Sequence, residues 1–104
     1  MTFHCISSDE AAELMTDDHI ILADIRDQTS FRQGRIGNAW ELNNSTVGDF
    51  LATHDKSAPV IVYCYHGHSS QGAAKFLSEQ GFTTVYSLDG GYEEWKQQHP
   101  VNHD

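Results

Sequence analysis

Short apolar runs alternate along the chain with stretches whose apolar residues recur at helical spacing. Three runs rich in β-branched residues predict buried strands at residues 20–23, 60–63 and 83–86. Continuous apolar runs of this length are typical of strands that are covered on both faces. Helical spacing, together with capping residues or a terminal glycine, predicts helices at residues 8–15, 46–53, 69–80 and 89–98.

Strands that alternate with helices predict an α/β fold, with a central, mostly parallel sheet and helices on both faces. The chain has 104 residues, the length of one domain, so residues 1–104 are expected to fold as a single unit. A chain of this size buries about two thirds of its unfolded surface and can build a core without metal or disulfide support. Apolar residues near Cys5 predict a further strand at the start of the chain.

The charge balance disfavours two classes of partner. Six Lys and Arg against fifteen Asp and Glu give a formal net charge of −9. Binding to nucleic acid depends on cationic side chains that displace counterions from phosphates, and an anionic membrane surface repels the same excess of carboxylates. We therefore expect no nucleic-acid partner and no membrane partner. The acidic surface serves either solubility or the docking of a basic protein.

The two cysteines do not form a disulfide framework of the kind that small secreted proteins use. Residues 1–5 lack the basic stretch and apolar run of a secretory signal, so we expect a cytoplasmic protein with both thiols reduced. Cys5 is expected to be a small core or edge residue. Nothing in the sequence places it beside Cys64 as a resolving cysteine.

Cys64 carries the strongest chemical signal, because it follows the predicted strand 60–63 and precedes the predicted helix 69–80 by a short polar loop. Ligands of open α/β sheets bind beyond the carboxyl ends of the strands. The first N–H groups of a helix lack internal partners, and the positive end of the helix dipole attracts anions. A cysteine that faces such a site should have a lowered pKa, because its thiolate is stabilised there.

The loop residues fit an anion-binding cradle around this cysteine. Gly67 is expected to permit a strained turn and Gly72 to permit close packing. Ser69 and Ser70 can cap the helix or donate hydrogen bonds inward. The sequence therefore predicts an activated nucleophile at Cys64, and the alternative is an ordinary buried cysteine of the core.

Four segments in order carry a family resemblance. They are residues 22–27 with an Asp-x-Arg pattern, residues 31–39, the loop 64–69 that begins at the cysteine, and residues 88–95 with an Asp-Gly-Gly-x-x-x-Trp pattern. Over nearly its whole length the chain resembles the single-domain rhodaneses, which are sulfurtransferases. Within that family it most resembles the small bacterial thiosulfate sulfurtransferases associated with glycerol 3-phosphate metabolism genes.

The resemblance implies a thiosulfate:cyanide sulfurtransferase with a double-displacement reaction. The Cys64 thiolate would attack the outer sulfur of thiosulfate, release sulfite and become a persulfide. Cyanide, a small thiol or a thioredoxin-like protein would then accept the sulfur, which gives ping-pong kinetics. No metal or organic cofactor is implied. The backbone of the loop would stabilise the persulfide, and its residues after the nucleophile are Tyr65, His66, Gly67, His68, Ser69 and Ser70.

The sequence departs from the family pattern at two places. Arg35 stands where the second segment commonly has His, and we expect a structural or peripheral role for it. The loop offers His66 and His68 where many thiosulfate-using members have Arg or Lys, which predicts weak affinity for the thiosulfate dianion. Asp24 and Arg26 lie at the end of another predicted strand, which we expect beside the loop, and we expect them to hold the scaffold by a salt bridge or hydrogen bond rather than to act in the site.

Three other functions compete with this interpretation. A cysteine phosphatase needs Arg six positions after its nucleophile, where this chain has Ser70. A metal site built on Cys64, His66 and His68 would have an unusual ligand spacing and no second ligand pair. A non-enzymatic rhodanese-like module that docks a protein partner or relays sulfur is the third alternative, and the presence of Cys64 argues against it.

Overall fold

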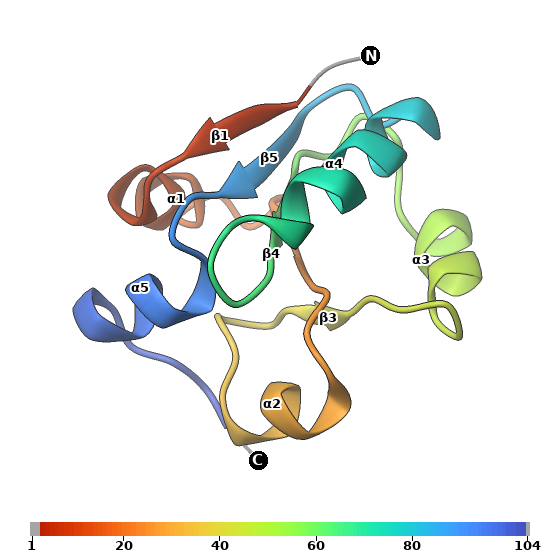
Figure 1. Ribbon diagram of the computed structural model, residues 1–104. Coiled ribbons are helices and arrows are strands. Elements are labelled where there is room, and N and C mark those ends of the chain that lie inside the picture. The colour runs from red at the N-terminus through yellow and green to blue at the C-terminus, as the bar shows by residue number, and fades with distance from the viewer. Residues whose placement is uncertain (1–2, 104) are drawn as a thin grey trace.

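A five-stranded sheet with strand order β1-β5-β4-β2-β3 forms the centre of the molecule, and every neighbouring pair of strands is parallel. The structure is a computed structural model and describes residues 3–103 (Figure 1). The strands are β1 His4–Ile6, β2 Ile21–Asp24, β3 Trp40–Glu41, β4 Val60–Tyr63 and β5 Val85–Leu88. The helices are α1 Ser8–Leu14, α2 Gln28–Gln33, α3 Val47–Thr53, α4 Ser69–Glu79 and α5 Gly91–Gln98.

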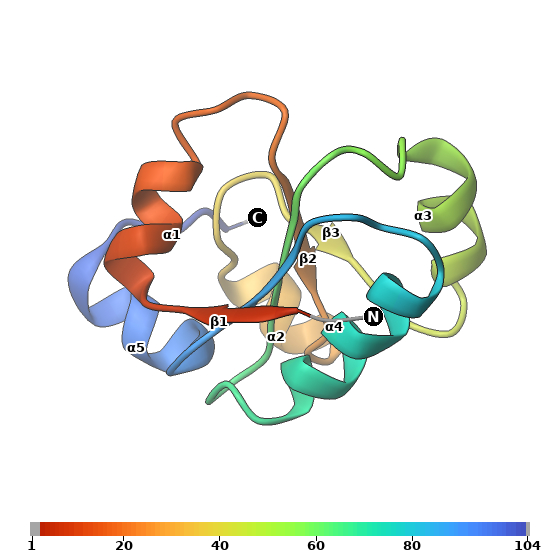
Figure 2. The same ribbon diagram turned by 90° about the horizontal axis from the view of Figure 1, so that it is seen from above.

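Helices cover the sheet on both faces, so the predicted α/β fold is confirmed. Helices α1 and α5 lie on one side of the sheet, and α3 and α4 lie on the other (Figure 2). The buried side chains of β4 alternate accordingly. Ile61 and Tyr63 belong to the core cluster under α1 and α5. Val60 and Val62 belong to the cluster under α3 and α4. None of the helices within residues 3–103 has the length and apolar character needed to cross a membrane.

Besides shifts of one or two residues at the ends of other elements, three elements differ from the sequence-based expectation. Strand β5 begins at Val85 and ends at Leu88, two residues later than predicted, because the Thr83 amide donates to the Lys56 carbonyl ahead of β4 and Ser87 continues the strand. The polar Ser87 hid this extension from an argument based on apolar runs. Helix α2 and strand β3 were not predicted, since α2 has no buried residue and β3 has only two residues.

The sheet register brings the carboxyl ends of β2, β4 and β5 together at one end of the sheet. Asp24 of β2 lies opposite Tyr63 of β4, and the Ile25 amide donates to the Tyr63 carbonyl at 3.1 Å. Ser87 of β5 lies opposite Val62 of β4. Because all strands are parallel, the segments that follow β2, β4 and β5 leave the sheet at the same end. Cys64, which follows the central strand β4, lies in the middle of this end of the sheet.

A buried ion pair anchors the segment after β2. The Arg26 guanidinium donates to the Asp24 carboxylate, with 2.7 Å between Nη2 and Oδ2, and the two side chains are 2% and 0% exposed. Arg26 also donates from Nη2 to the Gly34 carbonyl, and its guanidinium lies 3.9 Å from the centre of the Tyr92 ring. The structure thus places Asp24 and Arg26 in a scaffold ion pair, the role that the sequence favoured for them.

Loss of one partner of this pair should be costly, because the other charge would stay buried and unpaired. We expect Asp24→Ala to lower the free energy of unfolding by about 3–5 kcal/mol in urea denaturation. The double variant Asp24→Leu/Arg26→Met, which removes both charges, should recover much of that loss. A loss of less than about 1 kcal/mol in Asp24→Ala, the range of exposed pairs, would contradict a structural role for the ion pair.

Candidate active site

The Cys64 sulfur lies in a cradle of backbone N–H groups. Cys64 directly follows β4 and is only 4% exposed. Its Sγ accepts hydrogen bonds from the Gly67 amide at 3.2 Å and from the Ser70 amide at 3.3 Å. Ser70 is the second residue of α4, so its N–H belongs to the first turn, where helices have free donors. The expected arrangement of strand, loop and helix N-terminus around the cysteine is therefore present.

These donors outweigh the effect of burial on the thiol. Burial alone raises the pKa of Cys64, because it disfavours the thiolate. The Ser70 hydroxyl and the amides of Ser70, Gly67 and His66 stabilise the thiolate, and their combined effect lowers the pKa below its ordinary value. A lowered pKa makes the nucleophilic form available closer to neutral pH.

Cys5 has the opposite environment. It is exposed on the edge strand β1, so of the two roles expected for it the edge position is correct and the core position is wrong. Partial burial raises its pKa, and the nearby Asp89 carboxylate raises it further. The two thiols of the chain should therefore differ in acidity.

Ser70, rather than Ser69, is the serine that faces inward. His68 occupies the N-cap position of α4 and its side chain makes no cap hydrogen bond, so neither Ser69 nor Ser70 is the capping residue that the sequence allowed. Ser69 is exposed, whereas Ser70 is fully buried. The Ser70 hydroxyl bonds to the Ser87 hydroxyl of β5 at 2.8 Å. Ser87 was missed by the sequence argument, although a lone serine in an apolar strand could have indicated it.

The two glycines of this segment play unequal parts. Gly67 has a φ of +92°, and a Cβ there would lie 2.9 Å from the Gly90 nitrogen and 3.1 Å from the Leu88 carbonyl oxygen. The predicted strained turn at Gly67 is therefore present, and it permits close contact with the β5–α5 turn. The close packing expected at Gly72 is wrong, because a Cβ there would meet no atom within 4 Å among the described residues.

The start of α5 holds the loop by its backbone. The Tyr92 amide donates to the Cys64 carbonyl at 2.8 Å, and the Glu93 amide donates to the Tyr65 carbonyl at 3.0 Å. This contact needs a glycine at position 91, where φ is +60° and a Cβ would lie 2.5 Å from the Tyr65 carbonyl carbon. The glycine pair of the segment 88–95 thus serves the loop from a distant part of the chain.

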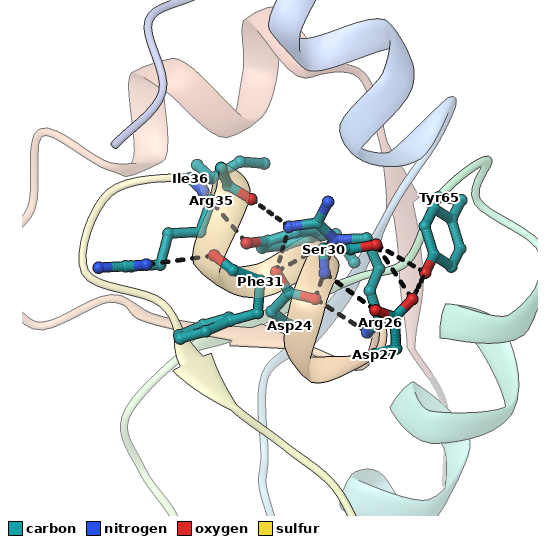
Figure 3. A network of polar contacts seen from close by, with 10 residues as sticks. Asp24, Arg26, Asp27, Ser30, Phe31, Arg35, Ile36 and Tyr65 are labelled. Carbon is teal, nitrogen blue, oxygen red and sulfur yellow. Dashed lines mark hydrogen bonds and ion pairs between the residues drawn. The ribbon is translucent and has the colours of Figure 1, made fainter. Parts of the chain in front are cut away.

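A side-chain tether holds the same loop from the other side. The Tyr65 hydroxyl donates to the Asp27 carboxylate and lies 3.0 Å from the Ser30 hydroxyl (Figure 3). Asp27 also caps α2 by accepting from the Ser30 amide at 2.9 Å. The bond from Tyr65, followed by the bonds from Ser30, lowers the pKa of Asp27 to about 2. Sequence reasoning missed Asp27 and Ser30, because their partner is 35 or more positions away.

The remaining loop side chains face outward. His66 and His68 are exposed, and the loop contains no Lys or Arg. Arg35, the other departure from the family pattern, donates to the Phe31 carbonyl at 3.1 Å and lies 4.7 Å from the Phe31 ring centre. Both contacts join Arg35 to Phe31 of α2, so its role is structural. Within residues 3–103, no group of three or more His, Cys, Asp or Glu side chains is arranged to hold a metal ion.

The opposite pKa shifts of the two cysteines give a test inside one molecule. We expect alkylation of Cys64 by iodoacetamide to have its pH midpoint below that of an ordinary thiol, and alkylation of Cys5 to have its midpoint above it. Peptide mass spectrometry across a pH series measures both sites in the same sample. Ser70→Ala should move the Cys64 midpoint upward and leave that of Cys5 in place, because it removes a hydrogen bond to the thiolate. Equal midpoints in the wild type would contradict the cradle.

Two glycine substitutions should have opposite effects. Gly91→Ala places a Cβ against the Tyr65 backbone at a left-handed position, and we expect it to lower the free energy of unfolding by at least about 1 kcal/mol. It should also slow the alkylation of Cys64. Gly72→Ala is the matched control and should raise stability by about 0.5–1 kcal/mol, because alanine favours a helix interior. Similar effects of the two changes in urea denaturation would show that α5 does not hold the loop.

Solved structures of similar fold include several small rhodanese-related proteins. A rhodanese-related protein from Thermoplasma volcanium is 23% identical, with 98% of this chain and 100% of that chain covered and a TM-score of 0.81. A rhodanese-like domain protein from Staphylococcus aureus is 21% identical, with coverages of 98% and 99% and a TM-score of 0.82. A protein from Rhodopseudomonas palustris, named as one of unknown function and a possible tyrosine phosphatase, is 20% identical, with coverages of 96% and 85% and a TM-score of 0.79.

The family model for the rhodanese-like domain matches residues 7–98. The matched region begins just before α1 and ends with α5, so it includes the cysteine loop and the segments that hold it. The solved structures named above share the fold of this chain over nearly its whole length. The chain belongs to the family of rhodanese-like domains.

Proposed function

We propose that this protein is a thiosulfate sulfurtransferase that carries sulfane sulfur as a persulfide on Cys64. The observation that carries the proposal is the position of the Cys64 sulfur between the amides of Gly67 and Ser70, with the lowered pKa that follows from it. Membership of the rhodanese-like family supports sulfur transfer as the general activity. The choice of thiosulfate as donor, and of cyanide or a thiol as acceptor, is the specific part of the proposal.

The first half-reaction needs a thiolate and a stabilised product. The Cys64 thiolate attacks the outer sulfur of thiosulfate, the S–S bond of thiosulfate breaks, and sulfite leaves with the electron pair. The hydrogen bonds of the cradle supply part of what a general base would otherwise provide, because they lower the pKa of Cys64. The product is Cys64–S–S⁻, an anion of the same charge as the thiolate.

The second half-reaction returns the enzyme to its starting state. The acceptor attacks the terminal sulfur, the S–S bond to Sγ breaks, and its electron pair stays on Sγ as the Cys64 thiolate. The negative charge remains at the start of α4 throughout the cycle, where the free amides and the helix dipole stabilise it. Helix α4 has 11 residues, long enough for a dipole of this kind.

The charge of the loop bears on the choice of donor. The segment from Cys64 to Ser70 contains no fixed cation, so the thiosulfate dianion is held by the backbone amides of the loop. Fixed cations bind such anions more strongly than neutral donors do. The proposal therefore includes a weak affinity for thiosulfate, and a donor of lower charge would suit the same cradle.

The phosphatase alternative lacks its main residue. The position where a cysteine phosphatase needs Arg is Ser70, whose hydroxyl bonds to Ser87 inside the core. A serine cannot replace the two-pronged contact of a guanidinium with phosphate. The same loop is therefore better suited to sulfur than to phosphate.

Intact mass spectrometry tests the proposal directly. Reduced protein exposed to thiosulfate should gain the mass of one sulfur atom, and cyanide should remove it. Cys64→Ser should gain nothing, whereas the matched control Cys5→Ser should behave as the wild type does. A gain that persists in Cys64→Ser would contradict the assignment of the sulfur carrier. If neither thiosulfate nor mercaptopyruvate nor a small persulfide loads the wild type, the protein is a binding module and the proposed function is wrong.

A further inference from the structure

An apolar groove lies on the same side of the sheet as α4 and the Cys64 sulfur. Its apolar lining comes from the segments after β2 and β3 and from α3 and α4, namely Ile25, Leu42, Val47, Ala73 and Phe76. Asn43 and Asn44 stand at the same groove, whose volume is about 250 Å³. Figure 2 shows α3 and α4 together on this side of the sheet. The proposed sulfur transfer assigns no part to these residues.

The groove adjoins the cysteine cradle through two of its residues. Ile25 directly follows β2, and its amide donates to the carbonyl of Tyr63, the residue before Cys64. Ile25 packs with the core cluster under α3 and α4, the side on which the Cys64 sulfur meets the start of α4. Ala73 lies about one helical turn after Ser70, whose amide bonds to the sulfur. The groove therefore lies next to the segments that hold the cysteine, on the α4 side of the sheet.

The groove exposes hydrophobic surface. Phe76, which lines it, is 40% exposed and is one of the two exposed large hydrophobic side chains among residues 3–103. The other, Tyr65, follows the nucleophile and bonds to Asp27, away from the groove. Within the same described residues, no charged side chain lines the groove, although the chain carries a net charge of −9. Local apolar surface on an acidic protein indicates a ligand with an uncharged apolar part.

We propose that this groove binds the apolar substituent of a thiol that accepts sulfur from Cys64. The inference rests on the proposed function and adds the chemical class of the acceptor. The thiol loses its proton to solvent, and its thiolate attacks the terminal sulfur of the persulfide. The S–S bond to Sγ breaks, its electron pair stays on Sγ, and the product is an organic persulfide anion. The groove lies below the usual size range of ligand pockets, about 300–1,000 Å³, so the substituent is small.

A series of alkanethiols measures the contribution of the groove. Protein loaded with sulfur is freed of donor and mixed with straight-chain thiols from ethanethiol to hexanethiol, and the loss of one sulfur mass is followed in time. These thiols have similar acidity, so their intrinsic nucleophilicity is nearly constant. We expect the second-order rate constant to rise about three- to fourfold for each added methylene until the groove is filled. Cyanide, which has no apolar substituent, is the reference acceptor.

Two variants and one control locate the effect. Phe76→Gln and Val47→Thr should each lower the ratio of the hexanethiol rate constant to the cyanide rate constant, because each replaces an apolar contact by a polar one. Lys75→Gln is the matched control, since Lys75 is exposed on the same helix and does not line the groove. It should keep the wild-type ratio.

The outcomes separate this inference from the function on which it rests. If sulfur loads onto Cys64 and leaves to cyanide, but the thiol series is flat, the inference is wrong and the sulfurtransferase function stands. A slope that persists in both groove variants would also overturn the inference. If the thiol series is flat, but reduced thioredoxin removes the sulfur at a rate that Phe76→Gln lowers, the groove binds a protein acceptor instead. A dimer in sedimentation that Phe76→Gln dissociates would assign it to a second copy of the chain. Failure of sulfur to load from any donor would overturn the proposed function itself.

Discussion

The hydrogen bonds that the Gly67 and Ser70 amides donate to the Cys64 sulfur are the interaction on which the rest of this structure depends. A buried thiol would otherwise resist ionisation, because burial disfavours the charged form. The Ser70 hydroxyl and the amides reverse that tendency and lower the pKa of Cys64. They can do so because only a short loop separates the end of β4 at Tyr63 from the start of α4 at Ser69, so that the sulfur meets a first-turn amide that has no partner within the helix. In the proposed reaction, the same donors stabilise the persulfide.

The loop that carries these donors is held from both sides by distant segments. The start of α5 contributes the amides of Tyr92 and Glu93, and the start of α2 contributes the Asp27 and Ser30 contacts of Tyr65. Beneath them, the buried pair of Asp24 and Arg26 fixes the segment that leads into α2. Donors that are fixed before a reaction need no rearrangement when charge moves, and this is how a site without a fixed cation can stabilise an anion.

The sequence predicted those features that depend on neighbouring residues. The apolar run of β4, the polar loop after Cys64 and the helical spacing of α4 lie within one short stretch, and together they indicated the nucleophile and its surroundings. Features that need distant partners were missed or misplaced. The inward role of Ser70 depends on Ser87, and the position of Tyr65 depends on Asp27. The close packing predicted at Gly72 was wrong, because a sequence does not show whether a helical glycine faces a neighbour or solvent.

The central claim is that Cys64 is a covalent sulfur carrier, and the sulfite released before any turnover tests it most directly. The protein is mixed with excess thiosulfate in the absence of an acceptor, and sulfite is followed in time. The account predicts a burst of one sulfite per chain, after which release stops because every Cys64 holds a persulfide. Absence of a burst, or continued release without an acceptor, would contradict it.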